Sequence, residues 1–123
     1  MMQQDPVVIV GCARTALGAF QGDLKDLAAP QLGSAAIRAA MQRSQLPLEE
    51  VQEVVFGCVL PAGLGQAPAR QAGIGAGIPV TAGASTVNKM CGSGMKAVML
   101  AHDLIVAGSA DIVVAGGMES MSN

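Results

Sequence analysis

The chain has 123 residues, of which 51% are apolar and 13% charged, and its formal net charge is −2. Its scattered cationic residues, with two Phe and neither Tyr nor Trp, argue against nucleic-acid binding, which needs concentrated charge and aromatic stacking. A membrane span is also excluded, because His102, Asp103 and Asp111 interrupt the most apolar region, residues 97–117.

Short apolar runs separated by glycine and turn residues predict four strands. They cover residues 7–11, 51–60, 83–87 and 111–117. The first and last runs are continuously apolar, which is typical of a strand that is buried on both faces.

Three helices are predicted between these strands. The first begins at Pro30 and ends before Pro47, the second covers residues 68–75, and the third runs from about Cys91 to Ala107. Strands that alternate with crossover helices predict an α/β fold with a mostly parallel sheet covered on both faces. The third helix is apolar on nearly all sides, so we expect a buried central helix in a structure larger than this chain.

Two other kinds of site receive weak support. Residues 73–77 read GxGxG without the third spaced glycine, and no clear strand leads into them, so a nucleotide-binding loop is disfavoured. A zinc site is conceivable from the cysteines and the histidine, but it lacks a closely spaced ligand pair. The candidate ligands are Cys12, Cys58, Cys91 and His102. We therefore expect no metal.

Cys91 stands where the extended segment 83–87 gives way to the third helix. The unpaired N–H groups and positive dipole end of a helix start favour a thiolate, which is the nucleophilic form. Gly92 and Gly94 leave room for a carbonyl group near the backbone amides. Position alone supports a nucleophile and a buried structural thiol about equally. Cys12 and Cys58 follow or lie in predicted strands, so we expect both to be core thiols.

A nucleophilic cysteine in acyl transfer needs a base, and His102 is the only histidine in the sequence. It lies eleven residues along the helix, which is roughly 16 Å from Cys91 at the rise of an α-helix. That distance exceeds hydrogen-bond reach, so His102 is expected to be a polar residue near a helix end. The base must come from outside this chain.

Four segments, spread in order along the chain, resemble the thiolase family, and most closely its acetoacetyl-CoA thiolases. They are Val8–Gly18, Gly65–Ala72, Asn88–Ala97 and Gly116–Ser122. The resemblance implies a thiolase-like layered fold, with residues 1–123 forming an incomplete N-terminal domain. The second segment resembles one that lies near the dimer interface in the family, which implies a homodimer or homotetramer.

The resemblance also implies an activity. Such enzymes condense two acetyl-CoA into acetoacetyl-CoA and CoA, or run the reverse thiolysis. Cys91 would accept the acyl group as a thioester, and its backbone N–H would be one donor of an oxyanion hole. Coenzyme A belongs to the substrate, so no separate cofactor is expected. Gly92 resembles the Cys-Gly-Ser-Gly form of enzymes that act on short substrates.

Parts of the family pattern do not occur in these residues. The activating His of a Gly-His-Pro block and the second Cys of a Cys-x-Gly-Gly-Gly block are missing, as are the inserted loop domain and the C-terminal domain. We therefore expect most substrate-binding residues in a remainder of the polypeptide, present as one chain or as a separate piece. The chain alone should show little or no turnover.

Other functions stay open, both inside and outside the thiolase family. The protein could be a non-catalytic thiolase-like assembly subunit, or a 3-ketoacyl-CoA thiolase of broader range. A ketosynthase is a further alternative, against which the segment 116–120 argues. The odd count of three widely spaced cysteines fits a reducing compartment, so we expect a cytoplasmic protein.

Overall fold

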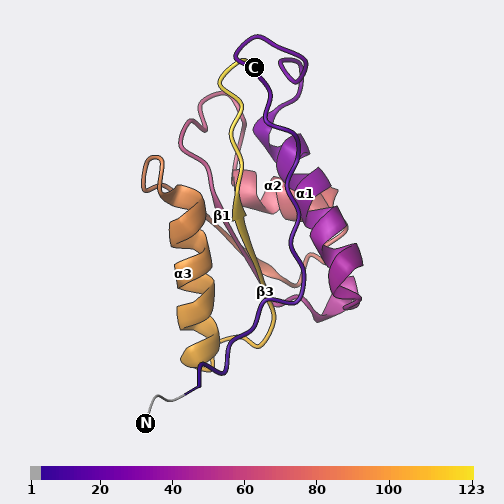
Figure 1. Ribbon diagram of the computed structural model, residues 1–123, viewed down its shortest axis with the longest axis vertical. Coiled ribbons are helices and arrows are strands. Elements are labelled where there is room, and N and C mark those ends of the chain that lie inside the picture. Colours follow the sequence, from indigo (N-terminus) through magenta and orange to yellow (C-terminus); the bar gives the residue numbers. More distant parts are fainter. Residues whose placement is uncertain (1–3) are drawn as a thin grey trace.

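The computed structural model describes residues 4–123, which form strands and helices in alternation after an irregular N-terminal segment (Figure 1). The elements are α1 (Ala29–Ser44), the short 3-10 helix η1 (Leu48–Glu50), β1 (Glu53–Gly57), α2 (Pro68–Gly75), β2 (Gly83–Val87), α3 (Ser93–Val106) and β3 (Val113–Gly117). No helix within this described range has the length and apolar character needed to cross a membrane.

The strands form a parallel sheet in the order β2-β1-β3, which confirms the predicted α/β fold. Gly57 at the end of β1 pairs with Val87 of β2 on one side and with Gly117 of β3 on the other. All three strands therefore end in register, and the loops that follow them leave from one edge of the sheet.

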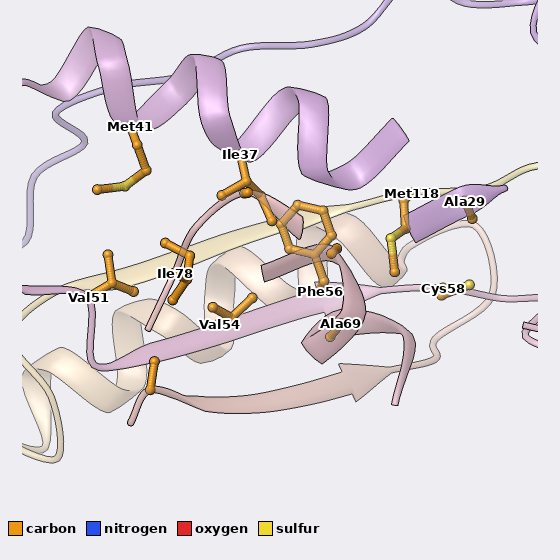
Figure 2. Close-up of a cluster of buried hydrophobic side chains, with 13 residues drawn as sticks. Ala29, Ile37, Met41, Val51, Val54, Phe56, Cys58, Ala69, Ile78 and Met118 are labelled. Atoms are coloured by element: carbon orange, nitrogen blue, oxygen red, sulfur yellow. The ribbon is translucent and has the colours of Figure 1, made fainter. Parts of the chain in front are cut away.

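Helices cover both faces of the sheet. Figure 1 shows α1 and α2 on one side of the strands and α3 on the other. The main core lies under α1 and α2, and Figure 2 shows Ile37 and Met41 of α1 projecting toward the strands. The buried cluster comprises Ala29, Ile37, Met41, Val51, Val54, Phe56, Cys58, Ala69, Ala72, Ala76, Ile78, Ala82 and Met118.

The prediction of a first strand at residues 7–11 is wrong for this chain. Val8 and Ile9 are 71% and 80% exposed, and the segment pairs with no strand among residues 4–123. It is attached to α1 instead, because Gly11 lies against the backbone of Ala40 and the Arg43 guanidinium donates to the Cys12 carbonyl at 2.8 Å. An apolar run becomes a strand only where a neighbouring strand offers hydrogen bonds.

The expected burial of the third helix is not completed by this chain. Of the residues in α3, Ser93, Ala97 and Ala101 are buried, and these face the sheet. Of its other apolar side chains, Leu100, Leu104 and Ile105 are half-buried and the rest are exposed, with Met95 at 73%. The reason is that no other described segment covers the outer face of α3. The most exposed side chains there are Met95, Val98, Met99 and Val106.

The glycines of residues 73–77 allow α2 to pack closely against β1 and α1. Gly73 faces Val54 of β1, and a side chain at Gly75 would collide with the Ser34 hydroxyl of α1. That hydroxyl donates to the Ala72 carbonyl at 2.8 Å. These contacts hold the end of α2 close to α1, and they give the glycines a structural role without a nucleotide.

The start of α3 packs closely against the ends of β1 and β3. A Cβ atom at Gly57 would lie 2.6 Å from the Ser93 carbonyl carbon and 2.7 Å from the Ser93 Cβ. A Cβ at Gly117 would lie 3.1 Å from the Gly94 Cα. Glycine is therefore required at the end of β1 and favoured at the end of β3 for the helix to begin at this point.

We predict that Gly57→Ala destabilises the protein by about 1–3 kcal/mol, the usual cost of forcing extra atoms into a packed interior. Gly94→Ala is the matched control, because its Cβ would lie 3.6 Å from the Gly117 backbone, an ordinary contact. Urea unfolding midpoints measure both changes. Equal midpoints for the two variants would contradict the steric argument.

Candidate active site

The loops that follow the three strands meet at the carboxyl edge of the sheet. They comprise residues 58–60 after β1, 88–91 after β2 and 118–120 after β3. The connection from β1 to β2 runs through α2 on one face, and that from β2 to β3 runs through α3 on the other. In parallel sheets, ligands bind outside the carboxyl ends where the connections diverge in this way.

Cys91 lies in this region, in a turn two residues before α3 begins. The cysteine is exposed, and the residue before it, Met90, has a φ of 50°, in the left-handed region that few side chains adopt. The Met90 peptide is held on both sides. Its N–H donates to Asn88 Oδ1 at 3.0 Å, and its carbonyl accepts the Ser93 hydroxyl at 2.6 Å.

Most N–H groups of this turn have partners within it. Lys89 N–H donates to Ser93 Oγ at 2.8 Å, Gly92 N–H to the Lys89 carbonyl at 3.1 Å, and Ser93 N–H to the Met90 carbonyl at 3.0 Å. The Cys91 N–H is not among these donors. The turn therefore orders the backbone around Cys91 through its neighbours.

Glu119, two residues beyond the end of β3, holds the loop that follows β1. Its half-buried carboxylate accepts the N–H of Val59 at 2.8 Å and that of Leu60 at 3.1 Å. From the other side, Asn88 Nδ2 donates to the Val59 carbonyl at 3.1 Å. The sequence reasoning missed both residues. Their signal was a polar side chain within two residues of the end of β2 and of β3, where parallel sheets gather their functional groups.

The other two cysteines differ in their surroundings. Cys58 is 1% exposed, which confirms it as a core thiol, and its Sγ lies 3.8 Å from Glu119 Oε1. Burial, followed by the charge of Glu119 nearby, raises the pKa of Cys58. Cys12 is exposed, so the prediction that it is a core thiol is wrong. The reason is that the segment before Cys12 lies on α1 and does not enter the sheet.

His102 pairs with the N-terminal segment. Its Nε2 lies 2.8 Å from Asp5 Oδ2, and its Nδ1 lies 3.5 Å from the Asp103 carboxylate. The hydrogen bond that His102 donates to the Asp5 carboxylate raises the pKa of His102. Within residues 4–123 no three His, Cys, Asp or Glu side chains gather closely enough to hold a metal ion, so the zinc alternative has no geometric support.

A cleft of about 430 Å³ lies beside this region. Residues 13–20 form one wall, residues 117–122 another, and α1 contributes Leu32 and Ala36. The Gln21 N–H donates to the Ser122 hydroxyl at 2.7 Å and joins the two walls. The cleft thus brings together the first and last family-like segments, but Cys91 does not line it.

Comparison with known proteins identifies the family. A family model described as the N-terminal domain of thiolase matches residues 7–123. The chain belongs to the thiolase family. Acetyl-CoA acetyltransferase 2 of Arabidopsis thaliana is 62% identical over 117 residues, covering 95% of this chain and 29% of that enzyme. Acetyl-CoA acetyltransferase of Cupriavidus necator is 58% identical over 116 residues, covering 94% of this chain and 30% of that enzyme.

A solved structure supports the same assignment. The Acat5 thiolase from Ascaris suum, crystallised in complex with coenzyme A, matches this thiolase chain with a TM-score of 0.92 and 43% identity. The match covers 94% of this chain and 30% of that one. The thiolase chain therefore has the family fold and spans less than a third of the length of these relatives.

We predict a pH-dependent loss of stability that depends on Cys58. Its pKa is raised in the folded state, so its contribution is complete below about pH 9, the ordinary value, and is lost as pH rises through the folded pKa. Cys58→Ser replaces the thiol by a hydroxyl group, which can still donate a hydrogen bond but does not ionise in this pH range. Under reducing conditions, the urea midpoint should therefore fall less steeply above pH 9 in the variant. Parallel curves would show that Cys58 does not titrate differently on folding.

Proposed function

We propose that the polypeptide carrying this chain condenses two acetyl-CoA into acetoacetyl-CoA and CoA, or catalyses the reverse thiolysis. The observation that carries the proposal is the exposed Cys91 thiol, held in an ordered turn at the carboxyl edge of the sheet. The relatives named acetyl-CoA acetyltransferase support the choice of substrate. The Cys-Gly-Ser-Gly sequence of residues 91–94 favours a short acyl group over a broader-range 3-ketoacyl-CoA thiolase.

In the proposed first half-reaction, the Cys91 thiolate attacks the carbonyl carbon of acetyl-CoA. A bond forms from Cys91 Sγ to that carbon, the bond from the carbon to the coenzyme A sulfur breaks, and CoA leaves as a thiol after taking up a proton. The Cys91 N–H, which the turn does not use, would donate to the negatively charged carbonyl oxygen.

In the second half-reaction, another acetyl-CoA loses a proton from its methyl carbon to a base. The resulting carbanion attacks the acetyl carbonyl, a carbon–carbon bond forms, and the Cys91 thiolate leaves with the electron pair of its thioester bond. The only histidine here, His102 on α3, pairs with Asp5 of the N-terminal segment, so the bases would come from the remainder of the polypeptide. Coenzyme A acts as part of the substrate, and the proposal needs no separate cofactor.

We predict that incubating the complete polypeptide with acetoacetyl-CoA, followed by quenching and peptide mass spectrometry, yields an acetyl adduct on Cys91. Cys91→Ala should abolish both the adduct and turnover, because no other thiol occupies this turn. Cys12→Ala, at an exposed thiol outside the site, should retain both. An adduct on Cys12 or Cys58 would refute the assignment, and a folded polypeptide without any adduct would favour a non-catalytic assembly subunit.

We further propose that the remainder of the polypeptide covers α3. Its outer face exposes Met95, Val98, Met99 and Val106, and the relatives are more than three times as long as this chain. Burying such side chains stabilises by about 1.5–3 kcal/mol each when complete. We also propose a cytoplasmic homodimer or homotetramer, supported by three free cysteines and by the segment 65–72, which resembles a region near the family's dimer interface.

We predict opposite effects for Val98→Lys in two contexts. In the chain of residues 1–123 alone, the lysine should reduce self-association, because it interrupts an exposed apolar face. In the complete polypeptide it should lower the thermal midpoint, because the charge would be buried. Ser109→Lys, at an exposed position beyond α3, is the control and should change neither. Equal tolerance of both lysines in the complete polypeptide would show that α3 stays uncovered.

A further inference from the structure

We infer that Glu119 and Asn88 are positioning residues for Cys91, connected to each other through the loop that follows β1. The inference rests on the proposed role of Cys91 as the acyl acceptor. Its basis is an unbroken series of hydrogen bonds that joins the loops beyond all three strands and ends at the residue before the nucleophile.

The series begins at Glu119. Its two carboxylate oxygens accept separate backbone N–H groups, those of Val59 and Leu60. Hydrogen bonds to an ionised carboxylate are stronger than those between neutral groups, and two of them fix the orientation of the peptide units they hold. The buried Cys58 thiol beside Oε1 adds a third contact to the same carboxylate. The loop after β1 is therefore held from the end of β3.

Asn88 carries the connection onward, because both ends of its side-chain amide are engaged. Nδ2 donates to the carbonyl of Val59, the residue whose N–H is bound by Glu119. Oδ1 accepts the N–H of Met90. A displacement of residue 59 would thus be transmitted to the peptide immediately before Cys91.

Met90 is the point at which this connection affects chemistry. A methionine with a φ of 50° adopts a conformation that costs free energy, and such a conformation persists only where surrounding contacts maintain it. The Met90 peptide also sets the direction of the Cys91 N–H and side chain. Cys91 itself is exposed, so core packing does not fix its position. The hydrogen bonds to Met90 therefore determine where the thiol lies.

The test measures two quantities in the complete polypeptide for Glu119→Gln, Asn88→Ala and the double variant. Single-turnover acetylation of Cys91 by acetoacetyl-CoA should slow by roughly ten- to hundredfold in each single variant, as expected for a misplaced reacting group. KM should change little while kcat falls. The double variant should be about as slow as the slower single variant, because both act through one connection.

The second quantity is amide hydrogen exchange in the segment 88–93, which does not depend on activity. Glu119→Gln should increase exchange in residues 58–60 and also in residues 88–93. Glu119 contacts residues 59 and 60 directly, and it is connected to residues 88–93 only through Asn88. Faster exchange confined to 58–60 would overturn the inference. If the unchanged polypeptide forms no acyl adduct, the proposed function fails, and the exchange measurement still decides whether the connection exists.

Gln52 provides a matched control. Its Oε1 accepts the N–H groups of Asp111 and Ile112, so it joins the β1 and β3 chains at the opposite end of the sheet. Gln52→Ala should reduce stability without changing Cys91 acetylation or exchange at 88–93. A comparable slowing in Gln52→Ala, or a double variant whose loss equals the product of the two single losses, would show only general structural effects.

Discussion

Close contact between the start of α3 and the ends of β1 and β3 determines most of the arrangement described above. Gly57 allows this approach because a side chain there would collide with Ser93, and Gly117 avoids a tight contact with Gly94. The buried Ser93 hydroxyl in turn binds both Lys89 and Met90. The geometry of the turn at Cys91 is therefore linked directly to the packing of a helix on a sheet.

At the same edge of the sheet, neighbouring residues differ in how their side chains are engaged. The side chains of Glu119 and Asn88 form hydrogen bonds with backbone groups of two loops, whereas the Cys91 thiol remains exposed. Such an arrangement is typical of sites in which a rigid scaffold presents one reactive atom. It also explains how a residue 60 positions away in sequence from Val59 can influence the turn at Cys91.

The two faces of the sheet differ in how well their helices are buried: α1 and α2 pack on a dense core, whereas α3 has an exposed apolar outer face. Between the sheet and the helices α1 and α2, the core is dense and includes Phe56 and Ile37 (Figure 2). Across the sheet, α3 exposes several large apolar side chains, and the apolar residues 8–10 lie exposed as well. Both features agree with the short span of the chain relative to its family members.

The sequence by itself determined the elements whose signals are local. Periodicity, glycine and proline placed β2 and α2 at their observed bounds and the other two α-helices and sheet strands within a few residues, although η1 was not predicted. Four sequence segments, including the one around Cys91, indicated the family. Only the tertiary structure decided that residues 7–11 form no strand and that Cys12 is exposed. Strand formation requires a pairing partner, and an apolar run does not specify one. The hydrogen-bond partners of Glu119 and Asn88 could also not be predicted from the sequence. These partners lie as far as 60 and 29 residues away, and only folding brings such distant backbone groups within hydrogen-bonding distance.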